Sequence, residues 1–154
     1  MTPSPYIVGV GAANADIHGR SRAAVNLMDS NPGTMRVSVG GVTRNILENA
    51  ARLGLDARLV SAVGGDVFGR LILARSAAAG MDVSNVLVLP DAASSTYMTV
   101  LEPSGEMFVA VSDMSILAQL PEAYLAERVP LLHGAAAIAC DPSLPEETIL
   151  HLLA

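Results

Sequence analysis

Strand patterns and helix patterns alternate along most of this chain, and their order constrains the fold more than any other feature. The strand patterns lie at residues 6–11, 35–39, 57–63, 85–89 and 135–140, and the helical ones at 43–53, 66–80, 121–128 and beyond 144. Strands connected by helices favour a parallel sheet. The order therefore predicts an α/β fold, a layered parallel sheet with helices on both faces.

The first predicted helix has its apolar residues on one side. These residues are Ile46, Leu47, Ala50, Ala51 and Leu53. We expect this side to face the core, and Gly54 to end the helix. In the second helix, Asp66 is expected to cap the N-terminus.

Residues 95–111 interrupt this order. They alternate between polar and apolar types on both sides of Glu102-Pro103-Ser104-Gly105. A Pro followed by Ser-Gly between two such runs is typical of a β-hairpin. We therefore expect a small antiparallel flap beside the main sheet.

Composition excludes some classes of protein. Hydrophobic residues make up 51% of the 154 residues and charged residues 16%, which disfavours disorder. The net charge is −6, all nine basic residues are arginines, and no basic run is present. These numbers argue against a nucleic-acid partner. No segment resembles a membrane helix.

Cys140 is the one cysteine in the chain, so no internal disulfide is expected. Its place at the end of the apolar run 135–140 predicts a buried structural thiol. A single cysteine also favours a reducing, cytoplasmic location.

Polar residues follow the first strand. Asn14 and Asp16 are two residues apart, so in an extended chain both side chains face the same side. A carboxylate beside an amide suits a hydroxyl-rich ligand, and ligands of open α/β sheets bind at the carboxyl ends of the strands. A simple turn is the alternative.

Other interpretations of the N-terminal region are weaker. The G-x-G of Gly9 and Gly11 resembles a dinucleotide fingerprint, but Asn14 occupies the sixth position and no helical pattern follows. A chain without lysine has no P-loop. Asp16 and His18 share a face, yet no further ligand is near in sequence, and no metal site is predicted.

Gly40 and Gly41 lie between the strand at 35–39 and the helix that follows. Glycines allow a ligand to approach the backbone, or allow a tight turn with positive φ. Asn45 is in the first turn of the helix. Together with Asn14 and Asp16, these residues are expected to form one site.

These motifs, taken together, resemble the N-terminal half of the PfkB, or ribokinase-like, carbohydrate kinases. The resemblance rests on Asn14-Ala15-Asp16, on Gly40-Gly41 followed by Asn45, on Gly54, and on the Gly64-Gly65-Asp66-x-x-Gly69 segment. It runs from about Tyr6 to the end of the chain. Thr43 departs from the family, which usually has Ala, Pro or Gly there.

The resemblance implies transfer of the γ-phosphoryl group of ATP, with Mg²⁺, to a sugar hydroxyl. The sugar would be bound by Asn14, Asp16, Gly40, Gly41 and Asn45. Asp113 and Asp141 would be further contacts, unless they serve as cap or turn residues. Lid strands are implied near residues 16–20, 35–39 and 95–111, and exposed lid strands are compatible with a homodimer.

Within the family, residues 12–19, 40–54 and 110–116 are most similar to pseudouridine kinases, which implies the ribose 5′-hydroxyl as acceptor. A ribokinase- or fructokinase-type kinase and a non-catalytic sugar- or nucleoside-binding module are the alternatives.

The family's catalytic Gly-Ala-Gly-Asp motif does not occur in residues 1–154, and the last helix ends in an apolar run. We therefore expect an incomplete domain that holds the sugar-binding half, has no catalytic residue, and is inactive alone.

Overall fold

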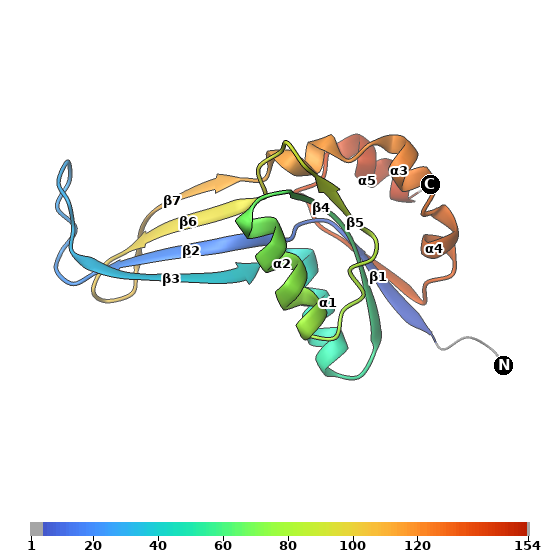
Figure 1. Cartoon of the computed structure of the whole chain (residues 1–154). Coiled ribbons are helices and arrows are strands. Elements are labelled where there is room, and N and C mark those ends of the chain that lie inside the picture. Colours follow the sequence, from blue (N-terminus) through green and yellow to red (C-terminus); the bar gives the residue numbers. More distant parts are fainter. Residues whose placement is uncertain (1–4, 154) are drawn as a thin grey trace.

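A parallel four-stranded sheet lies at the centre of the computed structural model, which describes residues 5–153. Its strand order is β5-β4-β1-β8 (Figure 1). The strands are β1 (Tyr6–Val10), β4 (Asp56–Gly64), β5 (Val86–Leu89) and β8 (Ala137–Cys140). The predicted parallel pairing is confirmed for all three neighbouring pairs.

Helices cover both faces of this sheet, as predicted (Figure 1). Helices α1 (Val42–Arg52) and α2 (Val67–Ala78) pack on one face. The other face is covered by η1 (Ser115–Gln119), α3 (Glu122–Ala126), α4 (Val129–His133) and α5 (Glu146–Leu153). No helix in the described part of the chain is long and apolar enough to cross a membrane.

Strand β4 shows how the two apolar cores are separated. Its alternate side chains point to opposite faces, so Val60 and Ala62 join one core while Leu59 and Val63 join the other. In β1, Gly9 allows α1 to pack closely, because a Cβ there would lie 2.6 Å from Thr43 Cγ2.

A second sheet extends from one end of the layered body (Figure 1). Its strand order is β3-β2-β6-β7, with β2 (Asn14–Ser21), β3 (Gly33–Gly40), β6 (Thr96–Leu101) and β7 (Met107–Asp113). Strands β6 and β7 form the predicted hairpin. The β2–β6 pair is parallel, so this sheet is mixed rather than purely antiparallel.

The buried side of α1 differs in part from the prediction. Leu47 and Ala50 are buried as expected, but Ile46 is 44% exposed and Leu53 is 82% exposed. The polar residues Thr43 and Arg44 are buried instead. Apolar periodicity did not reveal this, because each side chain bonds to a residue of another element, Thr43 to Asp141 and Arg44 to Ser76.

The prediction of a buried Cys140 is wrong. Strand β8 is at the edge of the main sheet, and within residues 5–153 it pairs only with β1. Cys140 is exposed and Ile138 is 44% exposed. The apolar sequence predicted burial on both faces, but an edge position leaves this strand partly uncovered.

Candidate functional site

A cavity of about 320 Å³ lies where the second sheet joins the layered body. It is formed by the end of the β1–β2 connection, the inner face of the second sheet and the first turn of α1. Its lining residues are Ala12, Asn14, Asp16, His18, Gly41, Val42, Asn45, Tyr97, Met114 and Ser143. The fold thus brings together four of the predicted site residues, from segments about 30 residues apart.

Asn14 and Asp16 form a pair at the start of β2. Asn14 is buried, and its Nδ2 donates a hydrogen bond to Asp16 Oδ1 over 2.7 Å. Among the described residues, no hydrogen bond reaches Asp16 Oδ2. The amide therefore holds the carboxylate in place and leaves one of its oxygens free to accept from a ligand.

Gly40 lies opposite Asn14 in the β2–β3 register. A Cβ at Gly40 would overlap the Asp16 carboxylate, with Cγ only 2.9 Å away. Gly40 is not among the lining residues of the cavity. Its lack of a side chain makes room for Asp16, and through Asp16 it contributes to the site.

Gly41 lines the cavity and is the N-cap residue of α1. Its φ is +106°, a conformation that favours glycine, and a Cβ would lie 2.9 Å from Ala13 Cα. Gly41 has no side chain to cap the helix. In the first turn, Thr43 N donates to Asp141 and Arg44 N donates to Ala12 O, while Val42 and Asn45 line the cavity.

Asp141 is buried behind this turn and does not line the cavity. Its Oδ2 accepts from Ala12 N at 2.8 Å and from Thr43 N and Oγ1 at 3.2 and 2.6 Å. Burial raises the pKa of Asp141, but hydrogen bonds from Thr43, Ala12 and Ser143 outweigh burial and lower it. The carboxylate connects β8, α1 and the β1–β2 connection.

Asp113 also lies outside the residues that line the cavity. It is exposed at the end of β7, and its Oδ1 accepts from Ser115 N over 3.0 Å. Hydrogen bonds from Ser115 lower the pKa of Asp113. In this structure Asp113 is a turn residue before η1, whose N-cap is Met114.

Six lining residues were not predicted: Ala12, His18, Val42, Tyr97, Met114 and Ser143. His18 Nδ1 lies 2.6 Å from Thr99 Oγ1, which fixes the ring against β6. The alternation Asn14, Asp16, His18 could have identified His18. Tyr97 is in register with Asp16, but a parallel pair between distant strands leaves no local sequence signal.

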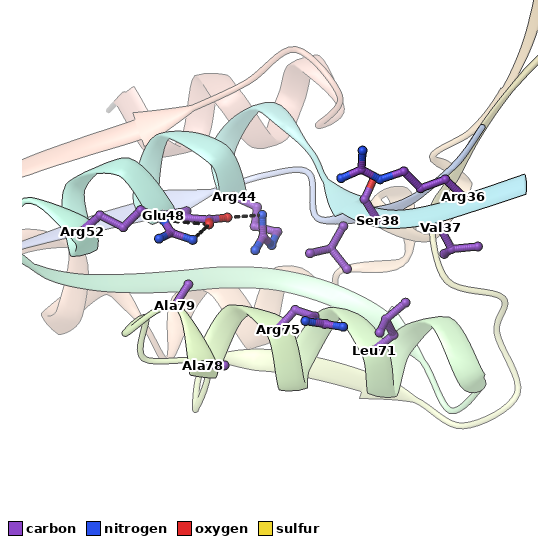
Figure 2. Close-up of a pocket in the computed structure, with 11 residues that line it drawn as sticks. Arg36, Val37, Ser38, Arg44, Glu48, Arg52, Leu71, Arg75, Ala78 and Ala79 are labelled. Atoms are coloured by element: carbon purple, nitrogen blue, oxygen red, sulfur yellow. Dashed lines mark hydrogen bonds and ion pairs between the residues drawn. The ribbon is translucent and has the colours of Figure 1, made fainter. Parts of the chain in front are cut away.

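A second cavity, of about 480 Å³, lies on the other side of α1, between α1, α2 and the edge strand β3 (Figure 2). Four arginines and one glutamate are among its lining residues, which are Arg36, Val37, Ser38, Val39, Arg44, Glu48, Arg52, Leu71, Arg75, Ala78 and Ala79. Sequence analysis did not predict this cavity, because its arginines come from three separate elements.

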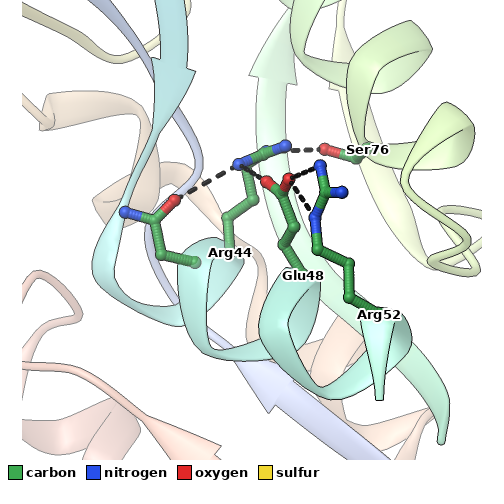
Figure 3. Close-up of polar contacts among 5 residues, drawn as sticks. Arg44, Glu48, Arg52 and Ser76 are labelled. Carbon is green, nitrogen blue, oxygen red and sulfur yellow. Dashed lines mark hydrogen bonds and ion pairs between the residues drawn. The ribbon is translucent and has the colours of Figure 1, made fainter. Parts of the chain in front are cut away.

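Arg44 connects the two cavities through hydrogen bonds (Figure 3). Its Nε donates to Ser76 Oγ at 2.9 Å, and its Nη1 lies 2.8 Å from Glu48 Oε2. Nη1 also donates to Asn45 Oδ1 at 3.2 Å. Because the amide oxygen of Asn45 is engaged, its NH₂ group is the part free to donate to a ligand.

Comparison with known proteins agrees with the family that the sequence motifs resemble. The model of the pfkB family carbohydrate kinases matches residues 4–153. The chain is 38% identical over 153 residues to pseudouridine kinase of Escherichia coli (strain K12), a match that covers 99% of this chain and 49% of that protein.

Solved structures agree on the fold. A carbohydrate kinase from Agrobacterium tumefaciens superposes with a TM-score of 0.86 at 28% identity, covering 97% of this chain and 48% of that one. Arabidopsis thaliana ribokinase, solved with ribose and ATP, gives a TM-score of 0.87 at 19% identity, with 97% and 49% coverage. The chain spans about half the length of the relatives it matches.

Proposed function

Because this chain belongs to the pfkB family of carbohydrate kinases, we propose that the complete protein transfers a phosphoryl group from ATP to a hydroxyl of a sugar or nucleoside. The cavity at Asn14, Asp16 and Asn45 is the proposed sugar site. The observation that carries the proposal is the Asn14–Asp16 pair, because Asp16 lines a cavity of about 320 Å³ and its Oδ2 accepts no hydrogen bond from the described residues.

The residues described here suit the sugar and not the triphosphate. The helix N-terminus after Gly64-Gly65 is occupied by the Asp66 carboxylate, which accepts from Gly69 N at 2.7 Å and would repel a phosphate. The sequence contains no Gly-Ala-Gly-Asp segment. The contacts to ATP and Mg²⁺, and the catalytic base, are therefore not assigned to any residue of this chain.

We propose that the second sheet acts as a lid over the sugar. Its inner face carries Asp16, His18 and Tyr97, which line the cavity. The lid would exclude water, which otherwise competes with the sugar hydroxyl for the phosphoryl group. In this arrangement the chain's own residues bind and orient the acceptor.

Pseudouridine is the proposed substrate, phosphorylated on its ribose 5′-hydroxyl. The 38% identity to pseudouridine kinase supports this choice. The test is a panel of pseudouridine, uridine, ribose, fructose and adenosine, assayed for ATP consumption with the complete protein. Preference for ribose or fructose would leave the family intact and remove pseudouridine as the substrate.

A sugar-binding module without catalysis is the second candidate, since residues 1–154 contain no catalytic motif. Calorimetry separates it from a kinase, because a module would bind the nucleoside and consume no ATP. Residues 1–154 on their own should bind weakly and transfer nothing. Phosphoryl transfer above background by this segment would contradict our account of where the chemistry lies.

Asp16→Ala tests the site itself. One charged hydrogen-bond partner contributes about 1.5–3 kcal/mol, so sugar affinity should fall about 10- to 100-fold while ATP affinity is unchanged. Asp91→Ala is the matched control, because Asp91 is exposed and outside the cavity. Equal sugar affinity for wild type and Asp16→Ala would remove Asp16 from the site.

The outer face of the lid supports a homodimer. Cross-strand neighbours share a face, so Val37, Met98 and Val111 lie together on the side opposite to Asp16. These side chains are 44–59% exposed. We propose that this face packs on a second copy. Light scattering gives the molar mass in solution and compares wild type with Val111→Asp.

A cytoplasmic location stays a prediction from the single cysteine.

A further inference from the structure

The second cavity concentrates positive charge in an acidic protein. Four of the nine basic residues of the chain line it, against one glutamate, while the whole chain has a net charge of −6. The cavity therefore has a formal charge of +3. Such a concentration of guanidinium groups in one hollow is the usual recognition chemistry for phosphate and carboxylate groups.

Part of this charge is already neutralised within the protein. Glu48 forms ion pairs with Arg44 at 2.8 Å and with Arg52 at 2.6 Å (Figure 3). Hydrogen bonds lower the pKa of Glu48, the one from Arg52 having the largest effect and the one from Arg44 a smaller one. The carboxylate therefore remains charged near neutral pH. One carboxylate cannot balance four guanidinium groups.

Arg36 and Arg75 supply the charge that is left over. Neither forms an ion pair or a side-chain hydrogen bond with any other residue in the range 5–153. They come from opposite walls, Arg36 from β3 and Arg75 from α2 (Figure 2). An anion between these walls could accept from both.

Arg44 adds a donor at the base of the cavity. It is only 2% exposed, yet among the described residues its Nη2 group has no hydrogen-bond partner, whereas Nε and Nη1 are engaged. Its guanidinium plane is fixed by Ser76 and Glu48. A buried, oriented donor costs less entropy to use than a free surface arginine.

We propose that this cavity, formed by α1, α2 and β3, binds a phosphorylated small molecule of about the size of a nucleoside monophosphate. The volume of about 480 Å³ is within the range of small-molecule sites. The apolar side chains of Val39 and Leu71 offer a surface for the organic part of the ligand. The acidic net charge of the chain disfavours a long polyanion such as RNA.

Titration calorimetry of the complete protein with uridine 5′-monophosphate tests the proposal, with uridine as the uncharged counterpart. We expect Arg36→Gln and Arg75→Gln each to weaken binding of the monophosphate at least tenfold. Both residues are exposed, so melting temperatures should stay near that of wild type. Arg70→Gln is the matched control, since it removes the same charge from α2 outside the cavity.

The measurement needs neither ATP nor turnover, so its outcome is independent of the proposed kinase activity. The sugar-cavity variant Asp16→Ala is titrated in the same way. Three results would overturn the proposal: no binding of the monophosphate at millimolar concentration, equal binding by wild type and the three arginine variants, or a loss of binding in Asp16→Ala alone. The last result would place the ligand in the sugar cavity instead.

Discussion

Two junctions in this molecule share a Gly-Gly pair between a strand and a helix but differ in structure. In each, a strand ends in Gly-Gly and a helix follows, at Gly40-Gly41 before α1 and at Gly64-Gly65 before α2. At the second junction the Asp66 side chain closes the helix N-terminus, accepting from Gly69 N. At the first junction the N-cap residue is Gly41, which has no side chain, and the first-turn N–H of Thr43 donates to the distant Asp141.

We infer from this difference that the second junction is structural and that the first takes part in the proposed binding site. Ser94 completes the second one, because its N and Oγ donate to Asp66 at 2.8 and 2.7 Å while Oγ accepts from Gly64 N at 2.9 Å. Both oxygens of Asp66 and the hydroxyl of Ser94 are therefore bonded within the protein. At the first junction, Asp141 accepts from Thr43 N, and Gly41, Val42 and Asn45 line the cavity.

The largest expected effect is on folding, at the second junction. In Gly64→Ala the new Cβ would meet the backbone of Ala92 and lie 2.8 Å from Ser94 N, and backbone cannot move aside as a side chain can. We expect a loss of about 3 kcal/mol in the free energy of unfolding. Urea denaturation measures it, and an unchanged midpoint would show that the junction tolerates a methyl group.

The matched change at the first junction should act on binding instead. In Gly40→Ala the new Cβ would meet the carboxylate of Asp16, a side chain that can rotate away. The fold should survive, while sugar affinity falls by about 2 kcal/mol, or about 30-fold, because Asp16 leaves its position. If Gly40→Ala lowers the free energy of unfolding as much as Gly64→Ala does and leaves sugar affinity unchanged, the distinction between the junctions fails.

The sequence predicted much of this comparison and missed the rest for identifiable reasons. The alternation of strands and helices, the hairpin and the Asp66 cap follow from local patterns. The pairing of Asp141 with Thr43 joins residues 98 positions apart, so no local signal marks it. The same pair gives a reason for Thr43, where the family usually has Ala, Pro or Gly, because the Thr43 hydroxyl donates to Asp141. Burial of Arg44 and exposure of Cys140 were missed because both depend on tertiary neighbours.

A smaller effect concerns acid stability, which both junctions should share. Burial raises the pKa of Asp66, but hydrogen bonds from Ser94, Gly69 and Phe68 outweigh burial and lower it, as hydrogen bonds do for Asp141. A carboxylate whose pKa is lowered by folding stabilises the protein above its unfolded pKa of about 3.9. That stability is lost as the pH falls through the lower, folded-state pKa.

Asp66→Asn and Asp141→Asn should therefore each lose about 1.5 kcal/mol at pH 7 and show a flatter loss of stability below about pH 4. Thermal unfolding as a function of pH provides the measurement. Parallel acid profiles for wild type and both variants would show that these carboxylates do not control acid unfolding.

The smallest expected effect isolates one hydrogen bond behind the first turn of α1. Thr43→Val keeps the shape of a buried side chain and removes the hydroxyl that donates to Asp141 Oδ2 over 2.6 Å. Asp141 retains its bonds from Ala12 N and Thr43 N, so the loss should be about 1 kcal/mol, with sugar affinity unchanged because Thr43 does not line the cavity. A double-mutant cycle with Asp141→Asn checks the assignment. If the hydroxyl acts through Asp141, the double variant loses less than the sum of the single losses, whereas strict additivity would mean that Thr43 stabilises the junction by packing alone.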